Sequence, residues 1–334
     1  MAEPEIGNLT IDPSLDSPGV TAPQGVPTET RLQKIWQTAA WVAFGFICLI
    51  VFTIFKLPEE RVTGYIQDTI AYSLAPQGIT LTAGKASLSM IFGPAYKMKD
   101  VTITFPPPAT PAHIDEIRVY PSILPLLIGR YGAKIQIENG NGDMTASFSM
   151  RNSQGATDIS GWFKAKSLDL GKAGILPMAL GGVRGSMILS GSGKISGDIN
   201  SPTTLNGNVD ISLTKIVLEQ QSIQGFNVPR MTVSEGKFDV TLERSRAIIK
   251  TVSLGKPEKA EDDIRTTITG DILLGKQWES STLNTKAIFR LSENVTKSMP
   301  LIDALLGQAK QGDGSYGYNL QGPLLGPTYT PIGK

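Results

Sequence analysis

Three consecutive carboxylates, Glu261, Asp262 and Asp263, are the densest group of side chains in the sequence that could act as an acid and a base. They follow a segment of mixed charge that contains Lys256, Glu258 and Lys259. Mixed charge between two strand-like segments is typical of a solvated loop. We therefore interpret the three carboxylates as solvated surface rather than as a catalytic pair.

Glycine motifs that cradle phosphates are absent. A P-loop needs Ser or Thr directly after its Gly-Lys pair, because that hydroxyl binds the magnesium ion. The glycines at 191, 193 and 197 have the wrong spacing for a dinucleotide fingerprint, and we interpret them as hairpin glycines. A Gly-x-Ser-x-Gly nucleophile motif is not found. The Gly-Lys pairs, which continue with Ala, Ala, Ile, Phe and Gln, are Gly84-Lys85, Gly171-Lys172, Gly193-Lys194, Gly236-Lys237 and Gly275-Lys276.

The sequence holds one histidine, His113, and one cysteine, Cys48. A single cysteine excludes an intramolecular disulfide and a cysteine cluster for metal. His113 opens the strand-like stretch Ile114 to Tyr120, where we expect a surface or edge residue rather than a base. We predict no catalytic, cofactor-binding or metal-binding residues, no cofactor, and a protein that is not an enzyme.

The charge and composition of the 334 residues favour a turn-rich β protein. Lys plus Arg number 31 against 30 for Asp plus Glu, without a basic stripe, so we expect no nucleic-acid partner. Gly at 35 and Pro at 22 are high, whereas charged residues make up only 18%. These values suit many strands joined by turns.

An uncharged apolar run from Trp36 to Phe55 predicts a single transmembrane helix, within residues 35–56. Twenty helical residues rise about 30 Å, which matches the hydrocarbon thickness of a bilayer. A cleaved signal peptide is excluded by the long polar segment before the run and by its length. Two basic residues on each side leave the orientation open. The proline-rich residues 1–34 are expected to form a disordered tail.

Residues 57–334 are expected to form a β-rich domain that begins with a short helix at about 59–74. Val62, Ile66, Ile70 and Leu74 recur at helical spacing, and Pro76 and Gly78 should end the helix.

Beyond that helix the apolar residues alternate with polar ones, as in strands with one apolar face. Turn signals should reverse the strands, and no long helical pattern separates them, so an antiparallel sheet is predicted and a doubly wound fold is excluded. The alternating segments are Val209–Thr214, Phe238–Glu243, Ile264–Ile272 and Leu283–Leu291, and the turn signals are at 139–143, 191–193, 206–207 and 256–257.

Short interruptions should plug or end the sheet. Leu176–Leu180 and Ser298–Lys310 have helical character, with Ser298 as a possible cap. Tyr316, Tyr318 and Leu320 predict a final strand. The fold class is therefore mainly β, an extended and twisted antiparallel sheet after one transmembrane helix. Periodicity leaves open whether the sheet is an open groove or one half of a closed sandwich.

Several segments together resemble the type II secretion system protein N family. The most specific is Tyr120–Arg130, with the sequence YPSILPLLIGR, which is similar to a Pro-Ser-Leu-Leu-Pro-Leu-Leu-x-Gly stretch of that family. Further similar segments are Val62–Phe105, Leu168–Leu170, Gly185–Leu189, Leu301–Gly307 and Asp313–Tyr316.

This resemblance implies an accessory inner-membrane component of the type II secretion system. The amino terminus would be cytoplasmic, the β domain periplasmic, and the partners would be the inner membrane and other secretion components. A second resemblance, of architecture, is to AsmA-like proteins, which would imply lipid binding or transfer with acyl chains in an apolar β groove.

Overall fold

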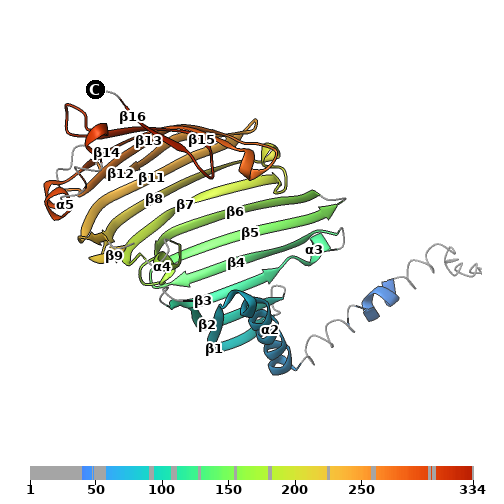
Figure 1. Ribbon diagram of the computed structural model, residues 1–334. Helices are drawn as coiled ribbons and strands as arrows, with labels where there is room; N and C mark the ends of the chain where they lie inside the picture. The colour runs from blue at the N-terminus through green and yellow to red at the C-terminus, as the bar shows by residue number, and fades with distance from the viewer. Residues whose placement is uncertain are drawn as a thin grey trace, which may run out of the picture. The chain divides into compact units, whose positions relative to one another are not determined.

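The computed structural model describes residues 40–46, 48, 58–89, 94–106, 111–126, 129–153, 156–179, 183–223, 226–256, 261–299, 302 and 306–332 (Figure 1). The predicted tail, residues 1–34, lies outside this part of the chain. Of the predicted span Trp36–Phe55, only residues 40–46 and Cys48 are described, and they are helical and exposed. No helix within the described ranges is long and apolar enough to cross a membrane. Residues 58–334 form one unit, to which the rest of this section refers.

The unit opens with helix α2, Glu59–Leu74, as the helical spacing predicts. Glu59 and Glu60 lie in its first turn, where carboxylates interact favourably with the helix dipole. Pro76 then stands in the short 3-10 helix η1, Ala75–Gln77, and Gly78 ends it with a left-handed φ of 69°. Glycine adopts that conformation without a Cβ penalty, so the predicted stop is confirmed.

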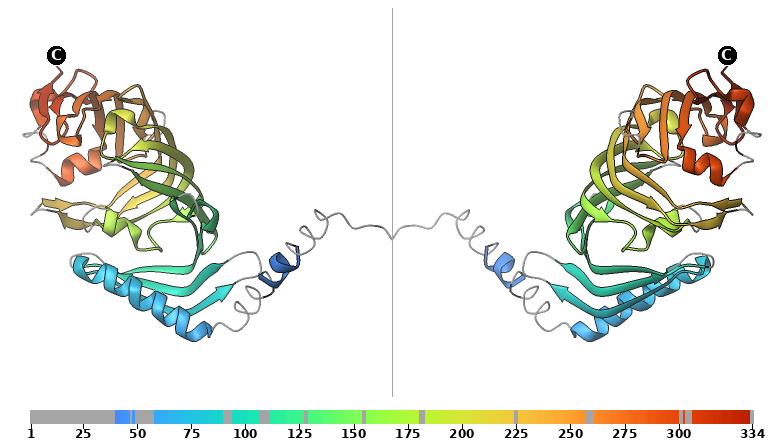
Figure 2. Two further views of the ribbon diagram at one scale, coloured as in Figure 1. Left: turned by 90° about the vertical axis from the view of Figure 1, so that its right-hand side faces the viewer. Right: turned by 90° about the vertical axis from the view of Figure 1, so that its left-hand side faces the viewer.

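Fourteen strands of the described residues form one antiparallel sheet in which nearly every strand pairs with its neighbours in sequence (Figure 1). The exception is a two-stranded hairpin, β9 and β10, inserted between β8 and β11. Figure 2 shows the twist of this sheet, which follows from the right-handed twist of each strand. The strands are β1 Thr80–Ser89, β2 Ala95–Thr104, β3 Ala112–Pro121, β4 Tyr131–Asn139, β5 Gly142–Ser153, β6 Ala156–Asp169, β7 Gly185–Asp198, β8 Asn206–Leu218, β9 Gln221–Ile223, β10 Phe226–Val228, β11 Met231–Glu243, β12 Arg246–Leu254, β13 Ile264–Leu273, β14 Thr282–Leu291, β15 Tyr316–Pro323 and β16 Thr328–Pro331.

The four alternating segments lie in β8, β11, β13 and β14, which confirms the predicted antiparallel sheet. Two predicted turns are wrong. Gly191-Ser192-Gly193 lies inside β7, and Asn206-Gly207 begins β8. Gly193 is needed for packing instead of reversal, because a Cβ built there would lie 2.5 Å from Cε1 of Phe163 on the neighbouring strand. The chain turns instead at residues 199–205, which include the 3-10 helix η2, Pro202–Thr204.

Short helices occupy some of the connections between strands. The predicted interruption at 176–180 is confirmed as α4, Ile175–Ala179. Ser298 is not a cap: it is the last residue of α5, Glu293–Ser298, and Ser292 caps that helix by accepting a hydrogen bond from the Val295 amide at 3.3 Å. Strand β16 follows the predicted final strand and is additional to the pattern of the sequence. The remaining short elements are α3 Ile123–Leu126, η3 Trp278–Ser280 and η4 Gly307–Ala309.

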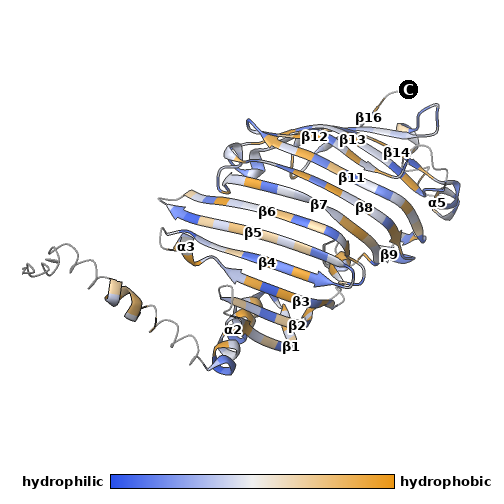
Figure 3. Ribbon diagram, turned by 180° about the vertical axis from the view of Figure 1, so that it is seen from behind, coloured by the Kyte–Doolittle hydropathy of each residue, from blue (hydrophilic) through white to orange (hydrophobic). Residues whose placement is uncertain are grey.

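The strand register places apolar side chains on one face and polar side chains on the other. Figure 3 shows this alternation as bands of opposite hydropathy along the strands. On the apolar face one row of paired residues crosses the whole sheet without a charged member: Leu88, Tyr96, Val119, Ile135, Ala146, Phe163, Gly193, Val209, Val240, Ile249, Gly270, Thr285, Leu320 and Tyr329.

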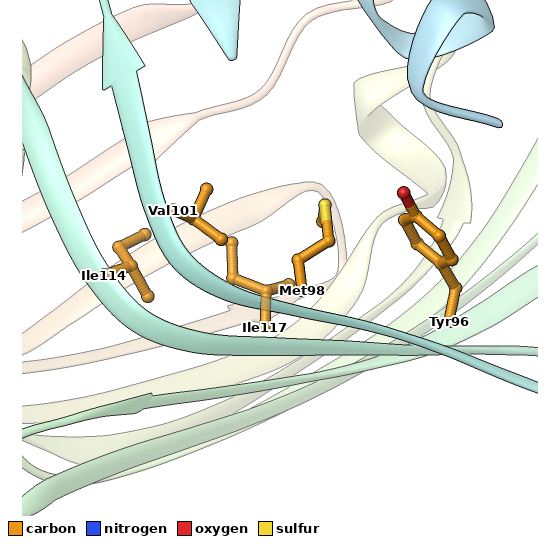
Figure 4. Close-up of a cluster of buried hydrophobic side chains, with 5 residues drawn as sticks. All are labelled: Tyr96, Met98, Val101, Ile114 and Ile117. Carbon is orange, nitrogen blue, oxygen red and sulfur yellow. The ribbon is translucent and has the colours of Figure 1, made fainter. Parts of the chain in front are cut away.

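Two clusters of fully buried side chains lie on this apolar face. In the first, Ile66 and Ile70 of α2 pack against the cluster on β2 and β3 that includes Met98, Val101 and Ile117 (Figure 4). Val101 is 0% exposed. In the second, Leu176 of α4 packs on β7, β8 and β11. The helices thus supply the second layer for two parts of the sheet.

The polar face carries an ion cluster across β2, β3 and β4. Glu116, whose side chain is 12% exposed, accepts hydrogen bonds from Lys97 at 2.8 Å and from Arg118, and Arg118 also contacts Glu138 at 3.3 Å. Burial alone would raise the pKa of Glu116, but the hydrogen bonds from Lys97 and Arg118 outweigh it and hold the pKa below its ordinary value of 4.5. The cluster ties three neighbouring strands together.

Substitution of Val101 tests where the sheet has a second layer. Val101→Ala should lower the free energy of unfolding by about 2–3 kcal/mol, because it removes two methyl groups from a fully packed site. Val209→Ala, on the same face but only half-buried, should cost less than about 1 kcal/mol. Urea denaturation of the full chain, followed by far-ultraviolet circular dichroism, measures both. Equal costs would show that Val209 is also packed under a second layer.

The Glu116 cluster predicts a pH dependence. A carboxyl whose pKa is lowered by folding stabilises the protein above its unfolded pKa, and this contribution is lost as the pH falls through the lowered, folded pKa. Glu116→Gln should therefore flatten the decline of stability with acidification below pH 4.5. Thermal unfolding at a series of pH values measures this. Glu138→Gln, which changes a more exposed partner, is the control. If stability of Glu116→Gln declined as steeply on acidification as that of the parent protein, the prediction would be contradicted.

Candidate functional site

The middle of the apolar face is the candidate site. It consists of two neighbouring rows of paired side chains, which we call the open apolar face. It is defined by Ile135, Ala146, Phe163, Val209, Val240 and Ile249 in one row, and by Ile137, Met144, Ile211, Phe238, Val252, Ile268 and Ala287 in the other.

The side chains of the open apolar face are neither buried nor fully exposed. All of them are of intermediate exposure, in contrast to Met98 and Val101 under α2. Phe148, beside Ala146 on the same face, is 49% exposed. Apart from the fourteen strands, the only sheet in the described part of the chain is the small β9–β10 hairpin. A second sheet packed face to face is therefore not among the described residues.

Covering elements stand at the borders of the open apolar face. Helix α2 covers β1 to β3, and α4 covers part of β7, β8 and β11. The loop before α4 is fixed to β3, since the His113 amide donates to the Ala173 carbonyl at 3.1 Å. Gly174, with φ of 66°, lets this loop approach Ala112 closely. Ile135 and Ile137, at one end of the open apolar face, pack against the cluster under α2, whereas its other residues belong to neither cluster.

The dimensions of the face follow from strand geometry. The open apolar face extends from β4 to β14, which are nine neighbouring strands with eight spacings of about 4.8 Å, so its longer row is roughly 40 Å long. Contiguous exposed apolar surface of more than a few hundred Å² marks an interaction site in a folded protein. The side chains that define the open apolar face are aliphatic, aromatic or, at Met144, a thioether, so the site can bind apolar groups but supplies no side chain for proton transfer.

The residues that the sequence singled out for chemistry do not converge. His113 is an exposed residue of β3, as expected, and its Nδ1 lies 3.4 Å from the Thr102 hydroxyl on β2. Cys48 is exposed within the short helical segment. Glycines 191 and 193 lie in β7, and no group of three metal-binding side chains is found in the described ranges.

The interpretation of Asp262 as solvated surface is wrong. Asp262 is 3% exposed and accepts hydrogen bonds from the amide and the hydroxyl of Ser234 and from the Lys256 amide, at 2.6, 2.8 and 2.8 Å. Asp263 accepts from the Thr232 amide at 2.7 Å. Ser234 and Thr232 lie on β11 beyond the end of its pairing with β12, so the two carboxylates bond the amides that no strand pairs there. Their role is to accept hydrogen bonds from backbone amides at this edge of β11.

Sequence reasoning found the apolar alternation but not the site, because a half-covered face and a packed core have the same period. The signal that was available is the length of the pattern: successive amphipathic strands, with few helices to cover them, provide more apolar surface than the helices can bury.

Comparison with protein-family models, with characterised proteins and with solved structures gives no match for this chain.

Proposed function

We propose that this protein binds the hydrocarbon chains of lipids along the open apolar face. The observation that carries the proposal is a row of paired residues across fourteen strands without a charged side chain, whose middle part is half-exposed. Burial of apolar surface is favourable by about 25 cal/mol per Å², so a hydrocarbon chain laid along these rows gains free energy without any specific contact.

The chemistry of the face favours lipid over a protein partner. A protein interface needs roughly one hydrogen bond per 100–200 Å² and usually has polar groups within it. The side chains of the open apolar face offer almost no hydrogen-bonding groups. Each leaflet of a bilayer contains chains about 15 Å long, so a row of roughly 40 Å has room for two of them end to end.

The predicted transmembrane helix at Trp36–Phe55 fits this proposal. It would hold residues 58–334 close to a bilayer from which lipid could enter. We propose the orientation that the family resemblance implies, with the amino terminus in the cytoplasm and the β domain in the periplasm of a bacterium. The function would then be AsmA-like lipid binding or transfer at the inner membrane.

Photo-crosslinking in living cells tests this proposal with the full chain in its own membrane. Benzoylphenylalanine at position 148 should form adducts with lipid, because Phe148 is on the apolar face and half-exposed. The matched control is benzoylphenylalanine at Ser147, its neighbour on the polar face of the same strand. Mass spectrometry of the purified protein measures the lipid adducts. Adducts of similar abundance at both positions, or none at 148, would count against the proposal.

A second candidate function is the accessory role in type II secretion. The observation that favours it is the exposure of Ile123 and Leu126, 51% and 45%, in α3. Both lie within Tyr120–Arg130, the segment that carries the resemblance to the secretion family. Exposed aliphatic residues on a short helix between two strands are suited to contact a partner protein.

Affinity purification from native membranes tests the secretion role. The tagged full chain should recover secretion components, and the variant Ile123→Ser/Leu126→Ser should recover fewer of them because it removes the apolar contact. Leu325→Ser, which changes another exposed leucine far along the chain, is the control. Recovery of no secretion component by the parent protein, together with intact secretion after deletion, would refute this role.

A further inference from the structure

A hollow lies on the polar face of the sheet, opposite the open apolar face. Its volume is about 830 Å³, within the size range of small-molecule sites. Most of its lining comes from polar-face residues of five neighbouring strands, β6, β7, β8, β11 and β12. One row of paired residues runs through it: Trp162, Lys194, Asn208 and Thr241. The open apolar face and this hollow are therefore separated by the thickness of the sheet.

Trp162 is the unusual member of this row. Tryptophan on a solvated sheet face exposes a large apolar ring to water, yet Trp162 is 46% exposed among serine, asparagine and lysine. Its cross-strand partners are Ser147 and Lys194, so no apolar neighbour in register covers it. An exposed aromatic ring of this kind is a platform on which a flat ligand with an apolar side can stack.

Hydrogen-bonding groups of both kinds surround the ring. Lys194 and Lys250 provide donors, Glu243 provides acceptors, and Asn208 provides both. The Thr241 hydroxyl also lines the hollow, and its oxygen is shielded from solvent without a hydrogen-bond partner in the described structure.

We propose that this hollow binds a saccharide. A pyranose ring has one face of C–H groups, which stacks on an indole, and a rim of hydroxyls that both donate and accept hydrogen bonds. Trp162 matches the first property, and Asn208, Glu243 and the lysines match the second. A peptide would find no free strand edge here, because all five strands are paired on both sides. A purely anionic ligand would meet the Glu243 carboxylate.

Binding of defined oligosaccharides to the full chain tests the proposal. The probes are the tetramers of N-acetylglucosamine, cellulose, amylose and galacturonic acid, measured by saturation-transfer nuclear magnetic resonance and by titration calorimetry. At least one should bind, and Trp162→Ala should weaken its affinity by about tenfold or more, since stacked aromatic residues dominate such contacts. Trp162→Phe should retain part of the affinity because it keeps an aromatic face.

Trp278→Ala is the matched control, because Trp278 is also exposed, at 43%, but lies in η3 away from the hollow. It should bind as the parent protein does. Circular dichroism of each variant establishes that it is folded. Failure of all four probes to bind at millimolar concentration would overturn the proposal, and so would equal affinity of Trp162→Ala and the parent protein. Lipid adducts at position 148 report on the open apolar face, so their presence or absence tests lipid binding independently of saccharide binding.

Discussion

The pairing register of the strands is the constraint on which the structure depends. Side chains alternate between faces, so a slip of one residue in any strand would move its apolar side chains to the opposite face. Ile135, Ala146 and Phe163 stay in one row only because β4, β5 and β6 pair without a slip. The clusters beneath α2 and α4, and the separation of an apolar face from a polar one, all follow from this registration.

The register survives local irregularities that would otherwise break the alternation. Met98 and Val101 are three residues apart yet lie in one cluster, and so do Leu213 and Ile216. Between each pair stands a residue with positive φ, Asp100 in the first case and Lys215 in the second, at 51° and 52°. An irregular residue of this kind turns the following side chains back to the first face. Two apolar residues three positions apart in a strand-like segment can therefore indicate an irregularity of the strand and not a helix.

The regular parts of the fold could be predicted, and the exceptions have physical causes. Helix α2 and strands with strict alternation follow from local pattern. The place of Gly193 depends on Phe163 of another strand, and the burial of Asp262 depends on the unpaired amide of Ser234; neither contact leaves a local signal. The sequence pattern does not decide between a groove and a sandwich, because the outcome depends on which surfaces find a second layer, and the period of a strand is the same in both cases.

The sequential order of the sheet has a consequence for its evolution. Because almost every strand touches only the strands before and after it, the length of the apolar face is set by the number of hairpins and not by a closed geometry. Insertion of one further hairpin would extend the face by about 10 Å and leave the existing pairs in place, as in repeat proteins. Duplication of hairpins can therefore change the length of the apolar face in discrete steps.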